Sequence, residues 1–296
     1  MKGELSLKDR WLDNPLWIAV TELALIHGGM EIMKLLADPM ANLSSQLEGA
    51  AAEFVTDATD LFLYMIPIIL CLLYMFLTKR SSLNVFVSGT AGKRIRSLLK
   101  GLLIGFILNG VVSLVAGLTG TVQYSFQSFV WYLPALLPFS FIQCSCEEVL
   151  LRGYVPAYME PRHQWGAVAF VSGTLFVFHH VENMHLYGFS TVFCLNVFLI
   201  GVLSYLFVRD QRNFWIACGI HTGWNYTQEY LFGLPNSGIS SPISLFVGKN
   251  PQSNFFFDPV YGNEGCLCAT VVLTITIILL LIKGRYFSEN KKEVYL

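Results

Sequence analysis

The sequence predicts an all-α, polytopic transmembrane helical bundle, and two observations carry this prediction. Hydrophobic residues make up 54% of the 296 residues and charged residues only 13%, whereas soluble domains carry about 25% charged residues. Long apolar runs also recur along the chain, and a helix needs about 20 mostly apolar residues to cross a bilayer. We therefore expect a multi-pass protein of the cell membrane, surrounded by lipid. The net charge of −1 gives no indication of a nucleic-acid partner.

About eight stretches are predicted to span the membrane. They lie approximately at residues 15–36, 59–78, 98–119, 129–157, 165–182, 187–208, 214–232 and 265–283. The first is amphipathic and could lie at the membrane interface instead. Because it contains Glu22, His27 and Glu31, it is also a poor signal-peptide core and is expected to stay in the mature protein. The fourth contains Pro134 and Pro138, which predict a kinked or extended start.

The basic residues predict that both termini are cytoplasmic. Loops rich in Lys and Arg stay on the cytoplasmic side of a membrane. With the N-terminus inside and eight spans, all of the 19 basic residues except Lys34 and Lys249 fall on that side. We therefore predict an N-in, C-in topology. Residues 234–265, which are rich in Asn, Ser, Pro and Gly, are then expected to form an irregular external loop.

Two adjacent carboxylates lie inside the fourth predicted span. Charged groups deep in a bilayer cost a few kcal/mol each on insertion scales, so they persist where they are paired or functional. Glu148 and Arg152 are four residues apart and can pair along one helix face, whereas Glu147 points about 100° away. Glu147 is therefore a candidate general base or acid. The Glu148–Arg152 pair could support catalysis or serve as a structural ion pair.

Two adjacent histidines, His179 and His180, lie in the fifth predicted span. Histidine carries protons near neutral pH and is a common metal ligand. Phe176 and His180 share one helix face at a spacing of four residues, and His179 faces another way. A single histidine in a helix is usually a satisfied core residue, so this feature alone indicates little.

His221 and Asn225 share one face of the seventh predicted span. Together they can donate hydrogen bonds to a developing oxyanion, although a polar contact between helices is the alternative. A helical rise of about 1.5 Å per residue places His221 roughly 12 Å, Asn225 roughly 18 Å, Glu147 roughly 20 Å and His180 roughly 24 Å from the inner ends of their spans. These depths predict that the groups meet inside the bilayer, with His180 nearest the outer side.

Three motifs in this order resemble those of the CAAX protease and bacteriocin-processing family of intramembrane proteases, which includes the type II CAAX prenyl endopeptidases. The motifs read Glu147-Glu148-Val-Leu-Leu-Arg152, Phe176-Val-Phe-His179-His180 and His221-Thr-Gly-Trp-Asn225. Each is weak alone, but all three in order within predicted spans are specific. The resemblance implies a catalytic core at residues 129–232. Three membrane helices precede it at 1–128, and an outer loop and a C-terminal span follow at 233–296.

The resemblance also implies a role for each motif residue. Glu147 with His180 would activate a water for attack on a peptide carbonyl, and His221 with Asn225 would stabilise the oxyanion. Glu148 and Arg152 would support the site. The substrate would be a membrane-associated or hydrophobic peptide, or a lipid-modified protein. Bacteriocin processing, processing of prenylated proteins and self-immunity all remain open.

A zinc ion is the open question of this mechanism. The family is often described as metalloproteases, and Glu147, His180 and His221 could ligate zinc with an open position for water. None of the six histidines is followed by Glu, however, so the helical His-Glu-x-x-His zinc motif does not occur. We favour a metal-free, glutamate-dependent mechanism, with zinc as the alternative.

Two other classes of function compete with an endopeptidase. A non-catalytic immunity or scaffold protein could bind a peptide in the same cavity. An ion-coupled transporter could use the same carboxylates and histidines as a proton relay, but the sequence shows neither an inverted repeat nor a pair of helices broken by Gly or Pro.

Overall fold

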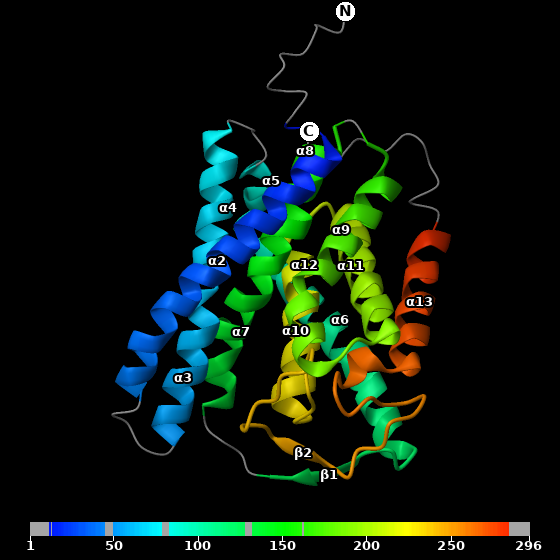
Figure 1. The fold of residues 1–296 in the computed structure, drawn as a ribbon. Helices are drawn as coiled ribbons and strands as arrows, with labels where there is room; N and C mark the ends of the chain where they lie inside the picture. Colours follow the sequence, from blue (N-terminus) through cyan, green and yellow to red (C-terminus); the bar gives the residue numbers. More distant parts are fainter. Residues whose placement is uncertain are drawn as a thin grey trace, which may run out of the picture.

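The computed structural model describes residues 12, 14–44, 50–78, 83–127, 132–161 and 163–283. The described chain is mostly helical, and its long helices run side by side in a bundle (Figure 1). The topology prediction also used basic residues that lie outside the described residues, including Lys79, Arg80 and Arg162.

The helices follow one another in the predicted order. The first group comprises α2 (Pro15–Ser44), α3 (Ala50–Leu63), α4 (Met65–Leu77), the short α5 (Asn84–Val87) and α6 (Ala91–Leu118). The central group comprises α7 (Leu133–Glu148), the π-helical turn η2 (Val149–Tyr154), α8 (Val155–Met159), α9 (Trp165–His179) and α10 (Val181–Tyr187). The last group comprises α11 (Thr191–Gln211), α12 (Trp215–Tyr226), the π-helical turn η3 (Thr227–Leu231), the 3-10 turn η4 (Asn263–Gly265) and α13 (Leu267–Ile282).

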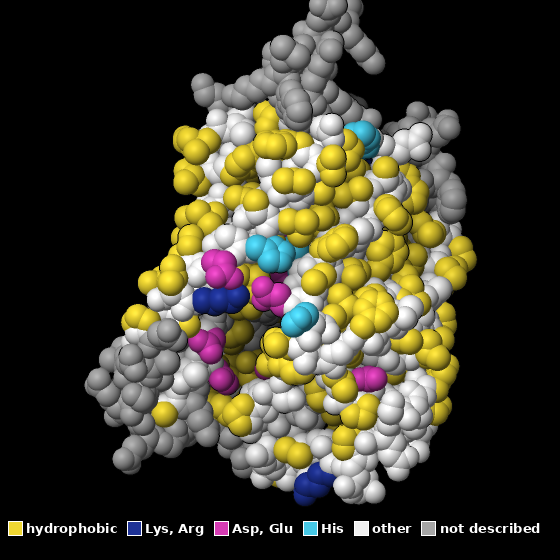
Figure 2. All heavy atoms as spheres, viewed as in Figure 1, with side chains coloured by type: hydrophobic (Ala, Val, Ile, Leu, Met, Phe, Trp, Pro, Cys, Tyr) yellow, Lys and Arg dark blue, Asp and Glu magenta, His cyan; other side chains and the backbone are white. Residues whose placement is uncertain are grey.

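The helices confirm a membrane protein. Four segments are long and apolar enough to cross a bilayer, namely Pro15–Ala37, Phe54–Leu77, Ala91–Leu118 and Thr191–Gln211, and two shorter apolar helices are Trp165–His179 and Leu267–Ile282. Large apolar side chains are exposed on the outer faces of the bundle, as expected for contact with lipid tails (Figure 2). The number of eight spans and the N-in, C-in orientation stay predictions.

A small β-ribbon departs from the all-helical prediction. Strand β1 (Gln123–Phe126) pairs antiparallel with β2 (Phe246–Lys249), which lies within the loop expected to be irregular. The ribbon closes one end of the bundle (Figure 1). Four-residue strands separated by more than 100 residues leave no local periodic signal, because their pairing depends on the tertiary fold that brings them together.

The fourth predicted span contains a helical irregularity directly after its two carboxylates. Helix α7 begins at Leu133 with Pro134 in its first turn, where the missing N–H of proline is tolerated, and it continues through Pro138. The π-helical turn η2 follows directly after Glu148 and contains Arg152. Turns of this kind occur frequently at functional sites.

Close contact between α6 and α12 fixes the position of the third motif. Each helix carries two glycines four residues apart, Gly101 and Gly105 on α6 and Gly219 and Gly223 on α12. A Cβ atom added at any of the four would lie 2.1 to 2.3 Å from a backbone oxygen of the other helix. Small residues at this spacing let membrane helices pack backbone to backbone. His221 lies between the two glycines of α12 and is held in place by this contact.

Candidate active site

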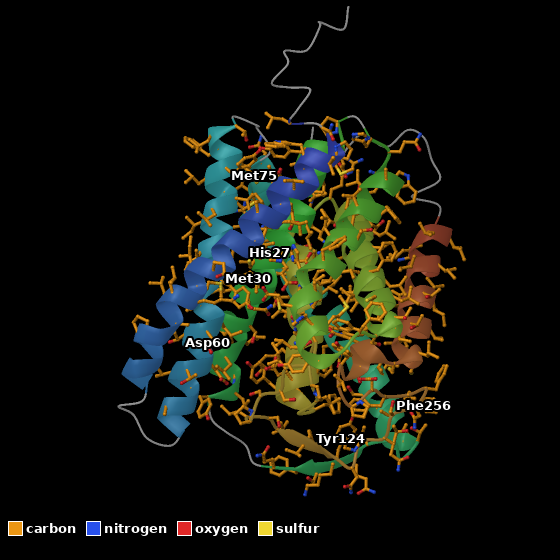
Figure 3. All side chains as sticks on the ribbon, viewed as in Figure 1. His27, Met30, Asp60, Met75, Tyr124 and Phe256 are labelled. Carbon is orange, nitrogen blue, oxygen red and sulfur yellow. The ribbon has the colours of Figure 1, made fainter. Side chains whose placement is uncertain are left out.

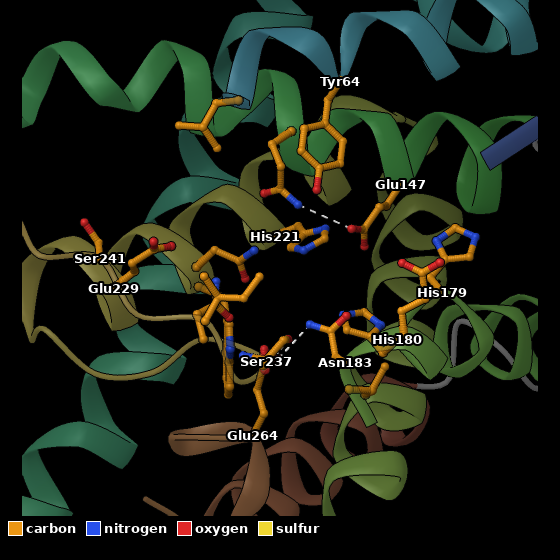
Figure 4. A pocket seen from close by; sticks show the side chains of 18 of the residues that line it. Tyr64, Glu147, His179, His180, Asn183, His221, Glu229, Ser237, Ser241 and Glu264 are labelled. Atoms are coloured by element: carbon orange, nitrogen blue, oxygen red, sulfur yellow. Dashed lines mark hydrogen bonds between the residues drawn. The ribbon is translucent and has the colours of Figure 1, made fainter. Parts of the chain in front are cut away.

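A cavity of about 470 Å³ opens between α2 and α3 on one side and α10 on the other. Its walls come from α2, α3, α7, α9, α10, α11, α12, η3, η4 and the loop at residues 236–242. Figure 2 shows the hollow on the surface, with acidic side chains on its rim. Four of the six predicted site residues line it, namely Glu147, His180, His221 and Asn225, and Figure 4 shows the first three around the same space. The other two, Glu148 and Arg152, are fully buried behind the wall.

Glu147 lies in the last turn of α7, and its side chain borders the cavity (Figure 4). Gln143, one turn earlier, donates from Nε2 to Glu147 Oε1 at 3.3 Å. The second oxygen, Oε2, has no hydrogen-bond partner among the described residues. A carboxylate with one free oxygen beside a cavity can accept a proton from a bound water.

Glu148 joins two of the predicted motifs. Its Oε1 lies 3.3 Å from Arg152 Nη1, so the predicted ion pair is present. The same oxygen accepts a hydrogen bond from His221 Nδ1 at 3.0 Å. A carboxylate can only accept, so the hydrogen of His221 is on Nδ1 and the ring orientation is fixed. An imidazolium at this position would present its Nε2–H to the cavity.

His180 is oriented by its own helix. It caps the C-terminus of α9, and its Nδ1 lies 2.9 Å from the carbonyl oxygen of Phe176. Because a backbone carbonyl only accepts, Nδ1 carries the hydrogen of the neutral ring. Nε2 is then an acceptor, which is the form that a general base requires.

Phe176 is the centre of the aromatic contacts at the site. Its ring centroid lies 5.1 Å from that of His180 and 5.5 Å from that of His221, both edge to face. The guanidinium carbon of Arg152 lies 4.8 Å from the same centroid. A cation over an aromatic face is stabilised by about 0.5–2 kcal/mol. Phe176 therefore separates Arg152 from the cavity while fixing both histidine rings.

His179 has a different partner, which the sequence did not indicate. Its Nε2 lies 2.6 Å from Oε1 of Glu22 on α2, and both side chains are buried. His179 also borders the cavity. Helical spacing predicts that it faces away from Phe176 and His180, and so it was not included in the predicted site. The one sequence feature that could have indicated this pair is the carboxylate of Glu22 within an apolar segment. A charged group in a membrane segment usually has a partner. The pair joins α2 to α9.

The positions of the candidate ligands show whether zinc could bind at this site. No group of three or more His, Cys, Asp and Glu side chains close enough to hold a metal ion occurs in the part of the chain that the structure describes. Glu147, His180 and His221 border one cavity without forming such a group. The residues therefore do not fit a zinc centre as they stand, and no step below uses one.

These features define a membrane protein whose helical bundle holds a carboxylate and two imidazoles beside a cavity, the groups that water-activating hydrolases use. Residues 129–227 match the family described as Type II CAAX prenyl endopeptidase Rce1-like. The resemblance to the CAAX protease family is thereby confirmed for about a third of the chain, and all six predicted site residues lie within it. The match supports protease activity in general. No curated protein matches the chain.

Proposed function

We propose that the protein is an intramembrane endopeptidase that cleaves membrane-associated or hydrophobic peptides. One observation supports this most directly. Glu147, His180, His221 and Asn225 border a single cavity within the helical bundle, although they come from three separate helical segments. The family match adds the reaction class, hydrolysis of peptide bonds.

The first step is attack by water. A water in the cavity gives a proton to Glu147, and the acceptor Nε2 of His180 orients this water. Its oxygen forms a bond to the carbonyl carbon of the peptide, and the carbonyl π electrons move to the oxygen. Bases of this kind contribute about 10²–10⁴-fold to rate.

The second step is collapse of the tetrahedral intermediate. His221 Nε2–H and the side-chain amide of Asn225 donate hydrogen bonds to its oxyanion, a contribution of about 2.7–4 kcal/mol for one such donor in other enzymes. The carbon–nitrogen bond then breaks, and the leaving nitrogen takes the proton held by Glu147. Glu148 favours the charged form of His221, and Arg152 balances the charge of Glu148.

The identity of the peptide is a finer part of the proposal. The family match suggests a lipid-modified protein as substrate. Processing of a bacteriocin, or self-immunity, is a further candidate role. A non-catalytic peptide-binding protein would use the same cavity, and its distinguishing result is peptide binding by the wild-type protein without cleavage.

The test is cleavage of a hydrophobic peptide library by the purified protein in nanodiscs, read by mass spectrometry. Glu147→Gln keeps the shape of the side chain and removes the base, so we expect the rate to fall about 10²–10⁴-fold. Glu31→Gln is the matched control, because Glu31 is an exposed carboxylate of α2 that does not border the cavity. Cleavage by Glu147→Gln at the wild-type rate would refute the proposal.

A further inference from the structure

The two ends of the bundle differ in charge. Lys93, Arg94, Arg96 and Lys100 lie at the start of α6, Arg209 and Arg212 at the end of α11, and Lys283 at the end of α13. These helix ends lie together, opposite to the β-ribbon (Figure 1). By the positive-inside rule this is the cytoplasmic end, and the ribbon end faces the other compartment.

The cavity lies toward the ribbon end. Its floor is the loop at residues 236–242, and Glu264 of η4 also borders it. Depth is counted here from the cytoplasmic ends of the helices. Asp60 lies about 25 Å along α3 and α4 from Leu77, and Glu229 lies about 21 Å from the first residue of α12. The hydrocarbon core of a bilayer is about 30 Å thick. Figure 3 shows Asp60 in the half of the bundle nearer the ribbon, and Met75 near the opposite end. The opening is therefore remote from the cytoplasmic end.

The wall of the cavity is strongly acidic. Six carboxylates border it, namely Asp57, Asp60, Glu147, Glu182, Glu229 and Glu264, and no Lys or Arg is among the described residues that do so. The nearby Lys34 is held at the rim by Glu31 at 2.7 Å and by Glu182 at 3.8 Å. The six carboxylates outnumber the three histidines on the same wall, His179, His180 and His221. A low-dielectric wall with an excess of one sign of charge attracts and concentrates the opposite sign.

The cavity wall also holds a buried polar group without a partner among the described residues. Trp224 borders the cavity and is only 2% exposed. Its indole Nε1–H has no hydrogen-bond partner in the described part of the chain. A buried donor without a partner is destabilising. The acidic wall favours a cationic ligand, and the proposed peptidase function makes that ligand a polypeptide.

We infer that the cavity receives a positively charged polypeptide segment from the non-cytoplasmic side of the membrane, through the opening between α2–α3 and α10. If the proposed function is right, this segment is the substrate. A segment that emerges from the membrane on the outer side, with Lys or Arg beside its apolar part, meets both the lipid-facing opening and the carboxylates.

The side of access is tested by cysteine labelling on intact cells with a membrane-impermeant maleimide. The reporter is Ser240→Cys, at an exposed position that borders the cavity. Ser253→Cys in the outer loop and Ala91→Cys at the start of α6 are the outer and cytoplasmic controls, and both positions are exposed. Cys194→Ala removes the one described cysteine that is not buried. We expect labelling at positions 240 and 253 but not at position 91. Labelling at position 240 only after permeabilisation would overturn the inference.

The charge preference is tested by protection of the Ser240→Cys reporter from labelling, in nanodiscs of neutral phosphatidylcholine. A synthetic lysine-rich hydrophobic peptide is expected to slow labelling, and its counterpart with glutamate in place of lysine is not. The double variant Asp60→Asn/Glu229→Gln should weaken protection about fivefold. The matched control Asp210→Asn, at the cytoplasmic end of α11, should leave protection unchanged. Equal protection by both peptides would overturn the inference.

The two proposals fail in different ways. Labelling and protection do not depend on catalysis, and mass spectrometry of the same lysine-rich peptide reports cleavage separately. Protection without cleavage of any peptide would contradict the endopeptidase and leave the inference standing. Cleavage of peptides that are offered only from the cytoplasmic side would support the endopeptidase and contradict the inferred access from the outer side.

Discussion

Replacement of Arg152 by Met should destabilise the protein strongly. The Arg152 side chain is fully buried, with Nη1 3.3 Å from Glu148 Oε1 and its guanidinium carbon 4.8 Å from the centroid of the Phe176 ring. Met fills a similar volume but leaves the charge of Glu148 inside the bundle, with His221 as its remaining partner among the residues that the structure describes. Removing one member of a buried ion pair typically costs about 3–5 kcal/mol. At roughly 2 °C for each kcal/mol in a large chain, the melting temperature should fall by about 6–10 °C.

The double variant Glu148→Gln/Arg152→Met separates charge from packing. It removes both charges, so part of the lost stability should return, with a coupling energy of about 0.5–3 kcal/mol between the two sites. Cleavage should stay impaired, because a neutral amide does not stabilise the charged form of His221. Recovery of cleavage would show that Glu148 has no electrostatic role.

Unfolding can be followed with a thiol-reactive fluorescent dye in detergent. Six of the seven cysteines are buried and become reactive when the bundle opens. Glu31→Gln serves again as the surface control. A fall of less than about 2 °C for Arg152→Met, or strict additivity of the single changes in the double variant, would refute the reasoning.

Three other predictions follow from the packing and charge of the fold. Gly219→Ala should destabilise the protein by about 1–3 kcal/mol in the same thermal assay, because the new methyl group meets α6 backbone at 2.3 Å; Gly110→Ala, with open space around it, is the control and should be neutral or slightly stabilising. Glu22→Gln should lower stability by about 1–3 kcal/mol but leave the cleavage rate per folded molecule unchanged, and loss of cleavage would instead assign His179 to the reaction. Burial raises the pKa of Glu264 above its ordinary value of 4.5. The stability of the protein should therefore fall as the pH rises from 4.5 through the raised pKa. Melting curves recorded across this pH range should show a smaller slope for Glu264→Gln.

Part of the candidate site follows from helical periodicity alone. The spacing of four residues places Glu148 beside Arg152, and the structure contains this ion pair. The same spacing relates Phe176 to His180, whose ring contacts Phe176. Periodicity also separates Glu147 from Glu148, and in the structure only Glu147 borders the cavity.

Contacts between helices could not be predicted in this way. The hydrogen bond from His221 to Glu148 joins residues 73 positions apart, and the Glu22–His179 pair joins residues 157 positions apart. A lone acidic residue in an apolar helix does not reveal its partner, because periodicity says which side chains share a face but not which helix lies against that face. For the same reason the contact of the α6 and α12 glycines became visible only in the fold.

Composition and spacing alone identified a membrane protein with several apolar helices and with three motifs in the order of the CAAX protease family. Composition and local spacing are sufficient for that, because a bilayer demands long apolar helices and a helix fixes its neighbours at three and four residues. The folded chain was needed to show the cavity that Glu147 borders, what holds each histidine, and that the acidic opening lies toward the ribbon end. Those features depend on the packing of helices that are distant in sequence, and packing is set by the shapes of whole surfaces and not by any local pattern.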